Sequence, residues 1–211
     1  MARTRSSGSS RRTSARARQQ RKAVARRRAV ALLIVFAGLI LAASTLLPKV
    51  EDTVRQVTLP LKHEDIIRQQ AADKDLDPAL VAGVIYAESR FRDQTSHAGA
   101  RGLMQITPQT AQEIANRSGA TNFEQADLAT PQVNIAYGTW YLRWLSERYG
   151  DNDALVLAAY NAGTGNVDKW IARDPGMKTD EIPFPETRHY VDNVLEARDD
   201  YRRTYRAELG L

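Results

Sequence analysis

The sequence predicts an all-α domain that is preceded by a single transmembrane helix and a disordered basic tail. Three observations lead to this fold class. Residues 29–47 carry no charge, helix starts marked by proline recur through residues 63–211, and alternating strand patterns are scarce there. The chain has 211 residues, so one medium-sized domain with a hydrophobic core fits after the N-terminal segments.

The N-terminal tail, residues 1–28, differs in charge from the rest of the chain. Lys and Arg number 30 in all, and 11 of them lie in this tail, which contains no acidic residue. Residues 29–211 therefore hold 19 basic and 25 acidic residues. The tail has no aromatic residue and cannot bury enough apolar surface to offset its conformational entropy, so we expect it to be disordered. A nucleic-acid-binding arm is the alternative, which the following segment disfavours.

Residues 29–47 (AVALLIVFAGLILAASTLL) form an uncharged, apolar run. As a helix this run spans roughly 28 Å, about the thickness of a bilayer core. Arg26, Arg27 and Arg28 directly precede it, which places the tail in the cytoplasm and the rest of the chain outside. We expect an uncleaved, single-pass signal anchor in the cell membrane. A cleaved signal peptide, with small residues near Ala42 and Ser44, is the alternative.

Residues 48–62 have mixed polarity and are predicted to be a linker, so that residues 63–211 form the outer domain. Helices begin where a capping side chain precedes a proline. This pattern occurs at Asp77-Pro78, Thr107-Pro108 and Thr130-Pro131, and the Asp151-Asn152-Asp153 cluster suits a fourth start. With glycines between these segments, six or seven helices are expected.

The composition excludes several classes of site. The chain has no cysteine, which excludes disulfides, thiolate zinc sites and a cysteine nucleophile. His63, His97 and His189 lie too far apart for a helical metal motif. We therefore expect no metal and no cofactor, although a carboxylate metal site is not excluded by these counts.

Glu88 ends an apolar stripe on the helix that follows Pro78. The stripe consists of Leu80, Val81, Val84 and Ile85. A carboxyl group there loses hydration and lies near the negative end of the helix dipole, and both effects raise its pKa. A proton held near neutral pH suits a general acid. The alternative is a structural ion pair with Arg90, Arg92 or Arg101, or exposure at a frayed helix end.

Two further segments carry polar side chains among small residues. In 96–111, glycines permit close backbone approach, and Gln105 offers a donor and an acceptor for sugar hydroxyl and acetamido groups. In 155–165, an apolar helix ends in Tyr160-Asn161. Taken alone, the first segment can be an ordinary loop with a buried Met104, and the second favours a core tyrosine whose hydroxyl is satisfied within the domain. Helical spacing favours core positions for Trp140 and Trp144, and Trp170 stays open.

Four motifs in order resemble the soluble lytic transglycosylase (SLT) domain, whose fold is related to goose-type lysozyme. They are Glu88-Ser89-Arg90-Phe91; Ser96 with Gly102-Leu103-Met104-Gln105-Ile106; Ala159-Tyr160-Asn161-Ala162-Gly163; and Glu186-Thr187-Arg188-His189-Tyr190-Val191. The resemblance covers about 63–205 and implies a lysozyme-like helical domain. His97 stands where the family often has proline.

The resemblance implies a role for each matching residue. Glu88 is the implied catalytic acid and base, Tyr160 supports it, and Ser89 braces the chain locally. The implied lining of a glycan groove is Ser96, Met104, Gln105, Tyr160, Asn161, Glu186 and Tyr190.

The implied reaction is the non-hydrolytic cleavage of peptidoglycan between N-acetylmuramic acid and N-acetylglucosamine, which leaves a 1,6-anhydro end. The expected partners are peptidoglycan strands and, through residues 29–47, the cytoplasmic membrane, with no nucleic acid. Because peptidoglycan lies outside this membrane, the predicted topology agrees with the implied substrate. A muramidase that hydrolyses the same bond and a non-catalytic glycan-binding protein are the alternatives.

Overall fold

The computed structural model describes residues 36, 54, 57–119, 122–150 and 152–211. The predicted tail (1–28) lies outside the described residues, and so does the predicted anchor (29–47) apart from Phe36. Among the residues that are described, no helix is long and apolar enough to cross a membrane. The chain divides into two units between Arg55 and Gln56, and the helices named below belong to the second.

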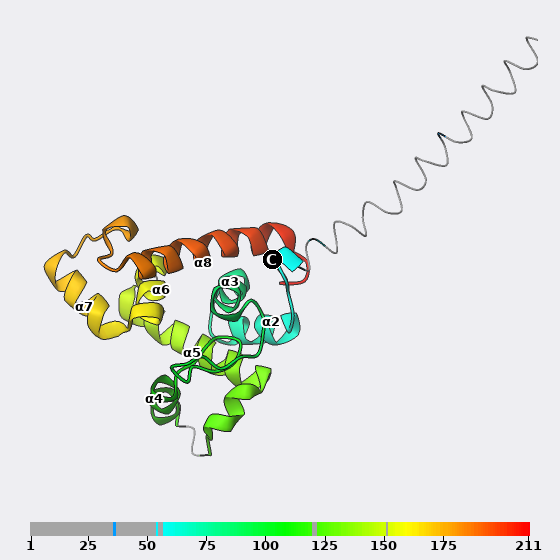
Figure 1. Ribbon diagram of the computed structural model, residues 1–211, viewed down its shortest axis with the longest axis horizontal. Coiled ribbons are helices and arrows are strands. Elements are labelled where there is room, and N and C mark those ends of the chain that lie inside the picture. The colour runs from blue at the N-terminus through cyan, green and yellow to red at the C-terminus, as the bar shows by residue number, and fades with distance from the viewer. Residues whose placement is uncertain (1–35, 37–53, 55–56, 120–121, 151) are drawn as a thin grey trace, which may run out of the picture. The chain divides into compact units, whose positions relative to one another are not determined.

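In its described part this second unit is helical, with seven α-helices, two 3₁₀ helices and no strand beyond two isolated bridges in the loop of residues 95–106 (Figure 1). The α-helices are α2 (Glu64–Asp73), α3 (Pro78–Ser89), α4 (Pro108–Ser118), α5 (Pro131–Tyr149), α6 (Asp153–Ala162), α7 (Thr164–Arg173) and α8 (Pro185–Thr204). The 3₁₀ helices are η1 (Gln125–Ala129) and η2 (Thr179–Glu181). The all-α prediction is confirmed for this part of the chain.

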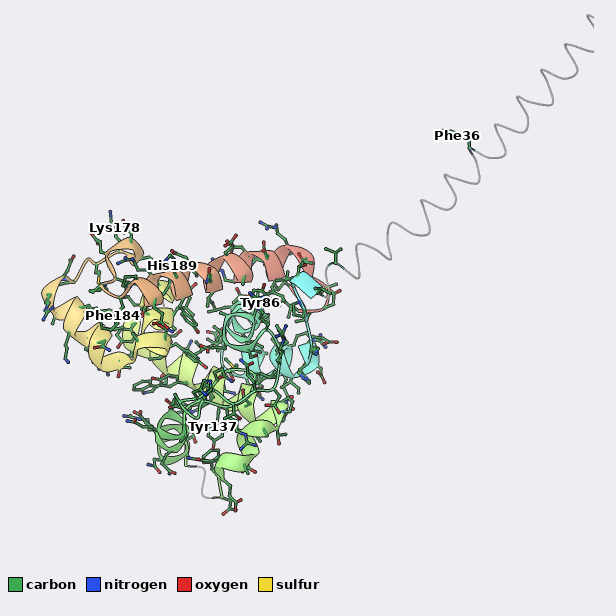
Figure 2. All side chains as sticks on the ribbon, viewed as in Figure 1. Phe36, Tyr86, Tyr137, Lys178, Phe184 and His189 are labelled. Atoms are coloured by element: carbon green, nitrogen blue, oxygen red, sulfur yellow. The ribbon has the colours of Figure 1, made fainter. Side chains whose placement is uncertain are left out.

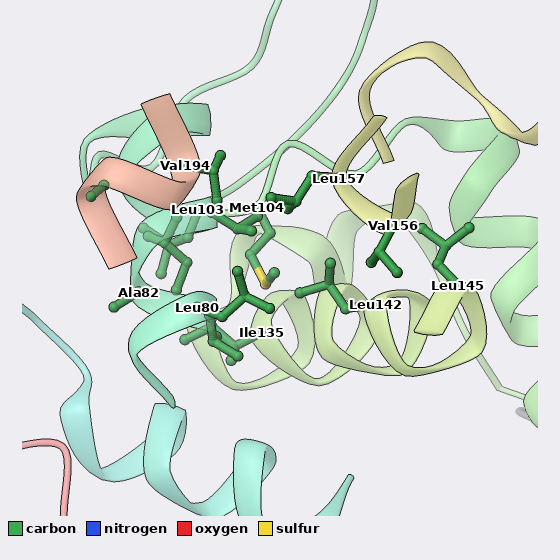
Figure 3. Packing of buried hydrophobic residues seen from close by; sticks show 14 of the residues in the cluster. Leu80, Ala82, Leu103, Met104, Ile135, Leu142, Leu145, Val156, Leu157 and Val194 are labelled. Atoms are coloured by element: carbon green, nitrogen blue, oxygen red, sulfur yellow. The ribbon is translucent and has the colours of Figure 1, made fainter. Parts of the chain in front are cut away.

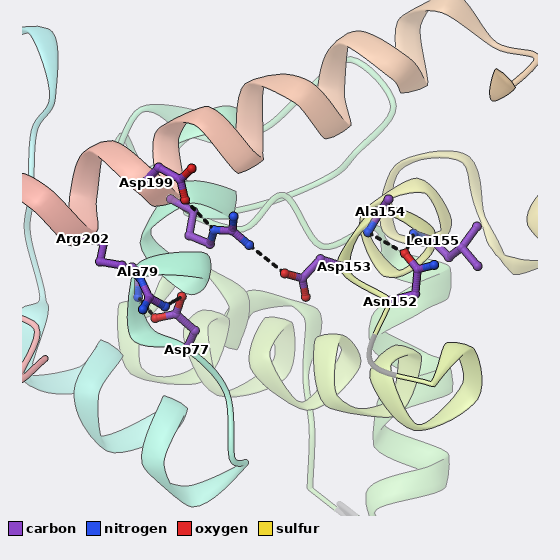
Figure 4. Close-up of polar contacts among 9 residues, drawn as sticks. Asp77, Ala79, Asn152, Asp153, Ala154, Leu155, Asp199 and Arg202 are labelled. Atoms are coloured by element: carbon purple, nitrogen blue, oxygen red, sulfur yellow. Dashed lines mark hydrogen bonds and ion pairs between the residues drawn. The ribbon is translucent and has the colours of Figure 1, made fainter. Parts of the chain in front are cut away.

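Local capping explains where the helices begin. The side chains of Asp77 and Thr107 each accept a hydrogen bond from a backbone N–H in the first turn of α3 and α4. Asn152 accepts two such bonds at the start of α6 (Figure 4). All four predicted starts are therefore confirmed, although the Thr130 side chain makes no capping bond at α5. There the proline at the first helical position sets the start.

Helix α3 lies at the centre of the hydrophobic core. Its residues from Ala79 to Ile85 are all buried, and its apolar side chains belong to one cluster with those of the other helices and of the 103–106 segment. Figure 3 shows part of this cluster, with labelled residues from α3, α5, α6, α8 and Leu103–Met104. Its most extensive contact is with α8, which runs across the picture while α3 is seen nearly end-on (Figure 1). The two backbones approach closely at Gly83, where an added Cβ would lie 2.9 Å from the Val194 carbonyl oxygen.

The last residues of the predicted linker are fixed on the domain. Three tyrosine hydroxyls, one from α3, one from α8 and one from the residue directly after α8, donate hydrogen bonds to consecutive backbone carbonyls in this segment. The pairs are Tyr86 with Thr58 (3.1 Å), Tyr205 with Leu59 (2.7 Å) and Tyr201 with Pro60 (2.5 Å) (Figure 2 labels Tyr86). Leu59 and Leu61 also pack against the core, so the chain enters α2 from a fixed direction.

Substitution of Gly83 tests the contact between α3 and α8. We expect Gly83→Ala to lower the free energy of unfolding by about 1–3 kcal/mol, because the new methyl group overlaps backbone atoms of α8. Gly165→Ala in α7 is the matched control, since nothing lies within 4 Å of its Cβ position; it should be neutral or slightly stabilising. Urea unfolding of the full chain in detergent measures both, and equal shifts would contradict the close contact.

Candidate active site

Glu88 lies in the last turn of α3, where the chain reverses direction. Arg90 and Phe91 follow with φ angles of 50° and 59°, so the helix ends directly after Ser89. The Ser89 hydroxyl donates to the carbonyl oxygens of Ile85 (3.1 Å) and Leu103 (2.7 Å). Ser89 is thus the local brace that was expected, and it ties the end of α3 to the loop that carries Gln105.

The Glu88 carboxyl group is partly buried and has one side-chain partner. The hydroxyl of Tyr190 donates a hydrogen bond of 2.7 Å to its Oε1 atom. Burial raises the pKa of Glu88 from its ordinary 4.5 to about 7, while the Tyr190 hydrogen bond acts in the opposite direction. In the described structure Glu88 forms no ion pair with Arg90, Arg92 or Arg101. The alternative interpretation of Glu88 as part of a structural ion pair is therefore wrong.

Tyr160 supports the site in a different way from the one expected. Its hydroxyl donates to the Met104 carbonyl oxygen (2.8 Å) and not to Glu88. The two groups are nevertheless close, because burial and then the Glu88 carboxylate raise the pKa of Tyr160 well above its ordinary value. The direct hydrogen bond to the carboxyl group belongs to Tyr190, which the sequence predicted only as part of the groove lining.

Ser96 and Gln105 shape the loop between α3 and α4. The Ser96 hydroxyl accepts the Ala100 backbone N–H (3.0 Å) and closes a turn. Gln105 has a φ angle of 47°, and its side-chain amide nitrogen donates to the carbonyl oxygens of Gly102 (2.7 Å) and Gln94 (3.0 Å). The loop thus engages the amide nitrogen of Gln105, and its amide oxygen is the group left to accept a hydrogen bond from a substrate.

Met104 lies behind the site and not on its surface. Its side chain has no exposed area and sits against Gly138, where an added Cβ would be 2.2 Å from its sulfur atom. It occupies the middle of the core in Figure 3. The expectation that its side chain lines a groove is therefore corrected. An unbranched apolar side chain beside a small residue fills core space, and Met104 acts on the site through its backbone carbonyl.

Asn161 and Glu186 lie at the facing ends of α6 and α8. Both are exposed. The Asn161 amide oxygen accepts a hydrogen bond of 2.8 Å from the Thr187 hydroxyl, which joins the end of α6 to the first turn of α8. Glu186 lies in that first turn, where a carboxylate is favoured by the helix dipole. Tyr190 follows Glu186 by four residues on the same face of α8.

Asn134 is a site-forming residue that the sequence analysis missed. It is buried on α5 and makes three side-chain hydrogen bonds, two of which hold the 101–106 segment in place. Its amide oxygen accepts from the Met104 N–H (2.8 Å), and its amide nitrogen donates to the carbonyls of Arg101 (2.9 Å) and Leu128 (3.0 Å). Two of these partners lie 30 or more residues away in sequence. The sequence gives no local signal for Asn134, because α5 mixes apolar residues with polar ones such as Gln132 and Arg143.

The arrangement is suited to proton transfer by one carboxyl group. Glu88, Tyr160 and Tyr190 come together, with Gln105 and Ser96 on the adjoining loop. Nowhere in the described ranges do three or more His, Cys, Asp or Glu side chains gather in a way that could hold a metal ion. A half-buried acid with a pKa near 7 can both donate and accept a proton at neutral pH.

The model of the transglycosylase SLT domain family matches residues 65–183. The soluble lytic murein transglycosylase of Salmonella typhimurium is 33% identical over 169 residues, which cover 77% of this chain and 26% of that protein. Membrane-bound lytic murein transglycosylase C of Actinobacillus pleuropneumoniae is 30% identical over 162 residues, covering 64% of this chain and 44% of that protein. The chain thus spans about a quarter of the length of the soluble relatives.

Solved structures of transglycosylases are also similar to this chain. An inactive glutamate-to-glutamine mutant of lytic transglycosylase Slt from Pseudomonas aeruginosa superposes with a TM-score of 0.67 at 32% identity, covering 72% of this chain and 26% of that one. The 70-kDa soluble lytic transglycosylase in complex with bulgecin A gives a TM-score of 0.68 at 32% identity, covering 76% and 27%. The lysozyme-like SLT fold that the motifs implied is therefore confirmed.

Removal of the Tyr190 hydroxyl tests the electrostatics of the carboxyl group. We expect Tyr190→Phe to raise the pKa of Glu88 further above 7, since the lost hydrogen bond favours the ionised form. Tyr160→Phe should change this pKa less, because that hydroxyl donates to a backbone carbonyl. Titration of the carboxyl carbon by NMR measures both, and an unchanged or lower pKa in Tyr190→Phe would refute the assigned role.

The raised pKa also predicts how stability depends on pH. The folded chain holds the Glu88 proton between pH 4.5 and about 7, so the stability that Glu88 contributes at low pH is lost as the pH rises through about 7. We expect Glu88→Gln to raise the free energy of unfolding by about 2 kcal/mol near pH 8. This is less than the free energy equivalent to the whole pKa shift, because the Glu88 carboxyl group contacts solvent.

Near pH 4 the same substitution should have little effect on stability, because Glu88 is then protonated in both the folded and the unfolded chain. Urea unfolding of the full chain in detergent at the two pH values measures the difference. A stabilisation that does not change with pH would contradict the shifted pKa.

Proposed function

The chain belongs to the transglycosylase SLT domain family, and we propose that it is a peptidoglycan lytic transglycosylase. The observation that carries this proposal is the half-buried Glu88 carboxyl group, whose pKa of about 7 suits alternate donation and acceptance of one proton. Relatives named as lytic murein transglycosylases support the choice of substrate. The proposed substrate is the β-1,4 bond from N-acetylmuramic acid to N-acetylglucosamine.

In the proposed reaction Glu88 acts first as an acid. It protonates the glycosidic oxygen while the bond to C1 of the muramic ring breaks, and positive charge develops on that ring. The substrate's own acetamido group stabilises this charge. Glu88 is then a carboxylate, and the Tyr190 hydroxyl at 2.7 Å stabilises this form.

In the second step Glu88 acts as a base. It removes the proton from the C6 hydroxyl of the same sugar, and the oxygen attacks C1 to close a 1,6-anhydro ring. The departing N-acetylglucosamine keeps the electron pair of the broken C1–O bond and the proton that Glu88 donated. The proton of the C6 hydroxyl then returns Glu88 to its initial, protonated form. No water enters, which distinguishes this reaction from the usual hydrolysis with two carboxyl groups.

The loop and rim residues would bind the glycan around this carboxyl group. The amide oxygen of Gln105 is a suitable acceptor for an acetamido N–H or a sugar hydroxyl. Ser96, Asn161 and Glu186 supply further polar groups at exposed positions. Tyr160 and Tyr190 add flat, partly apolar surface beside Glu88, and Met104 contributes only from behind.

We further propose that residues 29–47 anchor the chain in the cytoplasmic membrane, with residues 1–28 in the cytoplasm and the catalytic domain outside it. The uncharged run and the three arginines before it support this topology. A relative named as membrane-bound agrees with it. The anchor would confine cleavage to glycan strands near the membrane.

Analysis of the products tests the reaction. We expect the full chain in detergent to release muropeptides with anhydro ends, lighter than reducing ends by the mass of one water. Glu88→Gln should lower the rate about 10²- to 10⁴-fold, whereas Glu196→Gln, an exposed residue of α8, should keep it. Mass spectrometry distinguishes the outcomes. Reducing ends would identify a muramidase, and near-normal turnover by Glu88→Gln would exclude its role.

A further inference from the structure

Residues 58–61, which we call the strap, bind to the pair of helices that carries the candidate active site. The Tyr86 hydroxyl of α3 (Figure 2) donates to the Thr58 carbonyl oxygen at 3.1 Å. The hydroxyls of Tyr205 and Tyr201 donate to the next two carbonyl oxygens of the strap, at 2.7 Å and 2.5 Å. The strap thus joins the C-terminal end of α3 to the end of α8.

Aromatic packing extends this support to the residues around Glu88. The Tyr201 ring lies 6.1 Å from the ring of Tyr86 and 5.9 Å from that of Phe91. Tyr86 precedes Glu88 by two residues, and Phe91 follows it by three. The Arg90 guanidinium group lies 5.6 Å from the centre of the Tyr86 ring. The chain on both sides of Glu88 is therefore held by the cluster that also binds the strap.

Tyr86 and Glu88 point to nearly opposite sides of α3. Positions two residues apart are separated by roughly 200° around an α-helix. On one side Tyr86 donates to the strap, and on the other Glu88 accepts the Tyr190 hydroxyl at 2.7 Å. Rotation of α3 about its axis moves these two side chains in opposite directions. A hydrogen bond on each side therefore opposes the rotation.

Other contacts of α3 do not replace the strap in this respect. Where α3 crosses α8, Gly83 presents no side chain that could interlock with the Val194 backbone. The Ser89 hydroxyl donates to the Leu103 carbonyl oxygen at 2.7 Å, which holds the end of α3 to the loop and not to α8. The strap and the tyrosines that bind it are thus the support of α3 on the side away from Tyr190.

We infer that Tyr86, through its hydrogen bond to the strap, is a positioning residue for Glu88. By opposing rotation of α3, the strap keeps the Glu88 carboxyl group at hydrogen-bond distance from Tyr190 and in a fixed orientation towards the bond to be cleaved. This inference rests on the proposed function. It adds a role for a segment that was predicted to be a linker and that lies before residue 65, where the family match begins.

Kinetics of the full chain in detergent give the first test. We expect Tyr86→Phe, which keeps the ring and loses the bond to the strap, to lower kcat on peptidoglycan roughly three- to ten-fold, with KM changed less than about two-fold. Tyr201→Phe, which loses the bond to the Pro60 carbonyl oxygen, should act in the same direction. An unchanged kcat, or a loss that appears only in KM, would overturn the inference.

The pKa of Glu88 distinguishes positioning from a general loss of stability. The titratable groups that act on Glu88 are the hydroxyls of Tyr190 on α8 and Tyr160 on α6, and Tyr86→Phe changes neither. We expect Tyr86→Phe to raise the pKa of Glu88 above about 7, by less than Tyr190→Phe does, because the hydrogen bond that favours the carboxylate is weakened.

A double-mutant cycle makes this test specific. In the Tyr190→Phe background, Tyr86→Phe should leave the pKa of Glu88 unchanged, because the hydrogen bond through which Tyr86 acts is already absent. NMR titration of the Glu88 carboxyl carbon measures all four chains. Equal shifts with and without the Tyr190 hydroxyl, or no shift in either background, would refute the positioning role.

Tyr149→Phe is the matched control. Its hydroxyl also joins two segments, since it donates to the Asp168 carboxylate at 2.9 Å and links α5 to α7. This substitution should keep both kcat and the pKa of Glu88, even where thermal unfolding shows a loss of stability. A pKa shift as large as that of Tyr86→Phe would indicate a general loosening of the domain and would overturn the inference.

The pKa cycle also separates this inference from the proposed function, because it needs no turnover. A wild-type chain that makes no anhydro product, but whose Glu88 pKa responds to Tyr86→Phe only when the Tyr190 hydroxyl is present, would keep the positioning role and refute the reaction. A chain that makes anhydro product, but in which neither kcat nor the pKa responds to Tyr86→Phe, would keep the reaction and refute the positioning role.

Discussion

The hydrogen bond from the Tyr190 hydroxyl to the Glu88 carboxyl group connects the two helices whose contact dominates the domain. It forms only if α3 and α8 lie at one particular separation. That separation depends on Gly83, because any side chain there would meet the backbone of α8. A backbone contact in the core thereby sets the distance between two functional groups near its edge. The packing of the core and the proposed catalysis therefore share the same constraint.

The rest of the site is held by internal hydrogen bonds that leave few groups unsatisfied. Ser89, Asn134 and Tyr160 each bond to the backbone of the segment from Arg101 to Met104. These side chains come from α3, α5 and α6, so three helices fix one short loop. Preorganised groups of this kind lose little entropy when a substrate binds. Groups that these bonds leave free, such as the Gln105 amide oxygen, are the ones to which the proposed function assigns substrate contacts.

The sequence predicted those features that depend on neighbouring residues. The helix starts at Pro78, Pro108 and Pro131 follow from local capping and the fixed φ of proline, and the end of an apolar stripe identified Glu88. Long-range contacts were inaccessible to such reasoning. The bond of Tyr190 to Glu88, the bond of Tyr160 to the Met104 carbonyl, and the two bonds of Asn134 to Arg101 and Met104 depend on how α5, α6 and α8 cross the loop. Hydrophobic periodicity does not encode those crossings.

The pKa of Glu88 results from two opposing influences, and their balance suits the proposed chemistry. Burial alone would keep the proton on the carboxyl group, which favours the acid step but hinders the later base step. The Tyr190 hydroxyl favours the ionised form and so lowers the free energy of the carboxylate that exists between the two steps. A strong ion pair would favour that carboxylate too much and remove the acid at neutral pH. A neutral donor on a partly dehydrated carboxyl group avoids both extremes, which explains why a tyrosine and not an arginine faces Glu88.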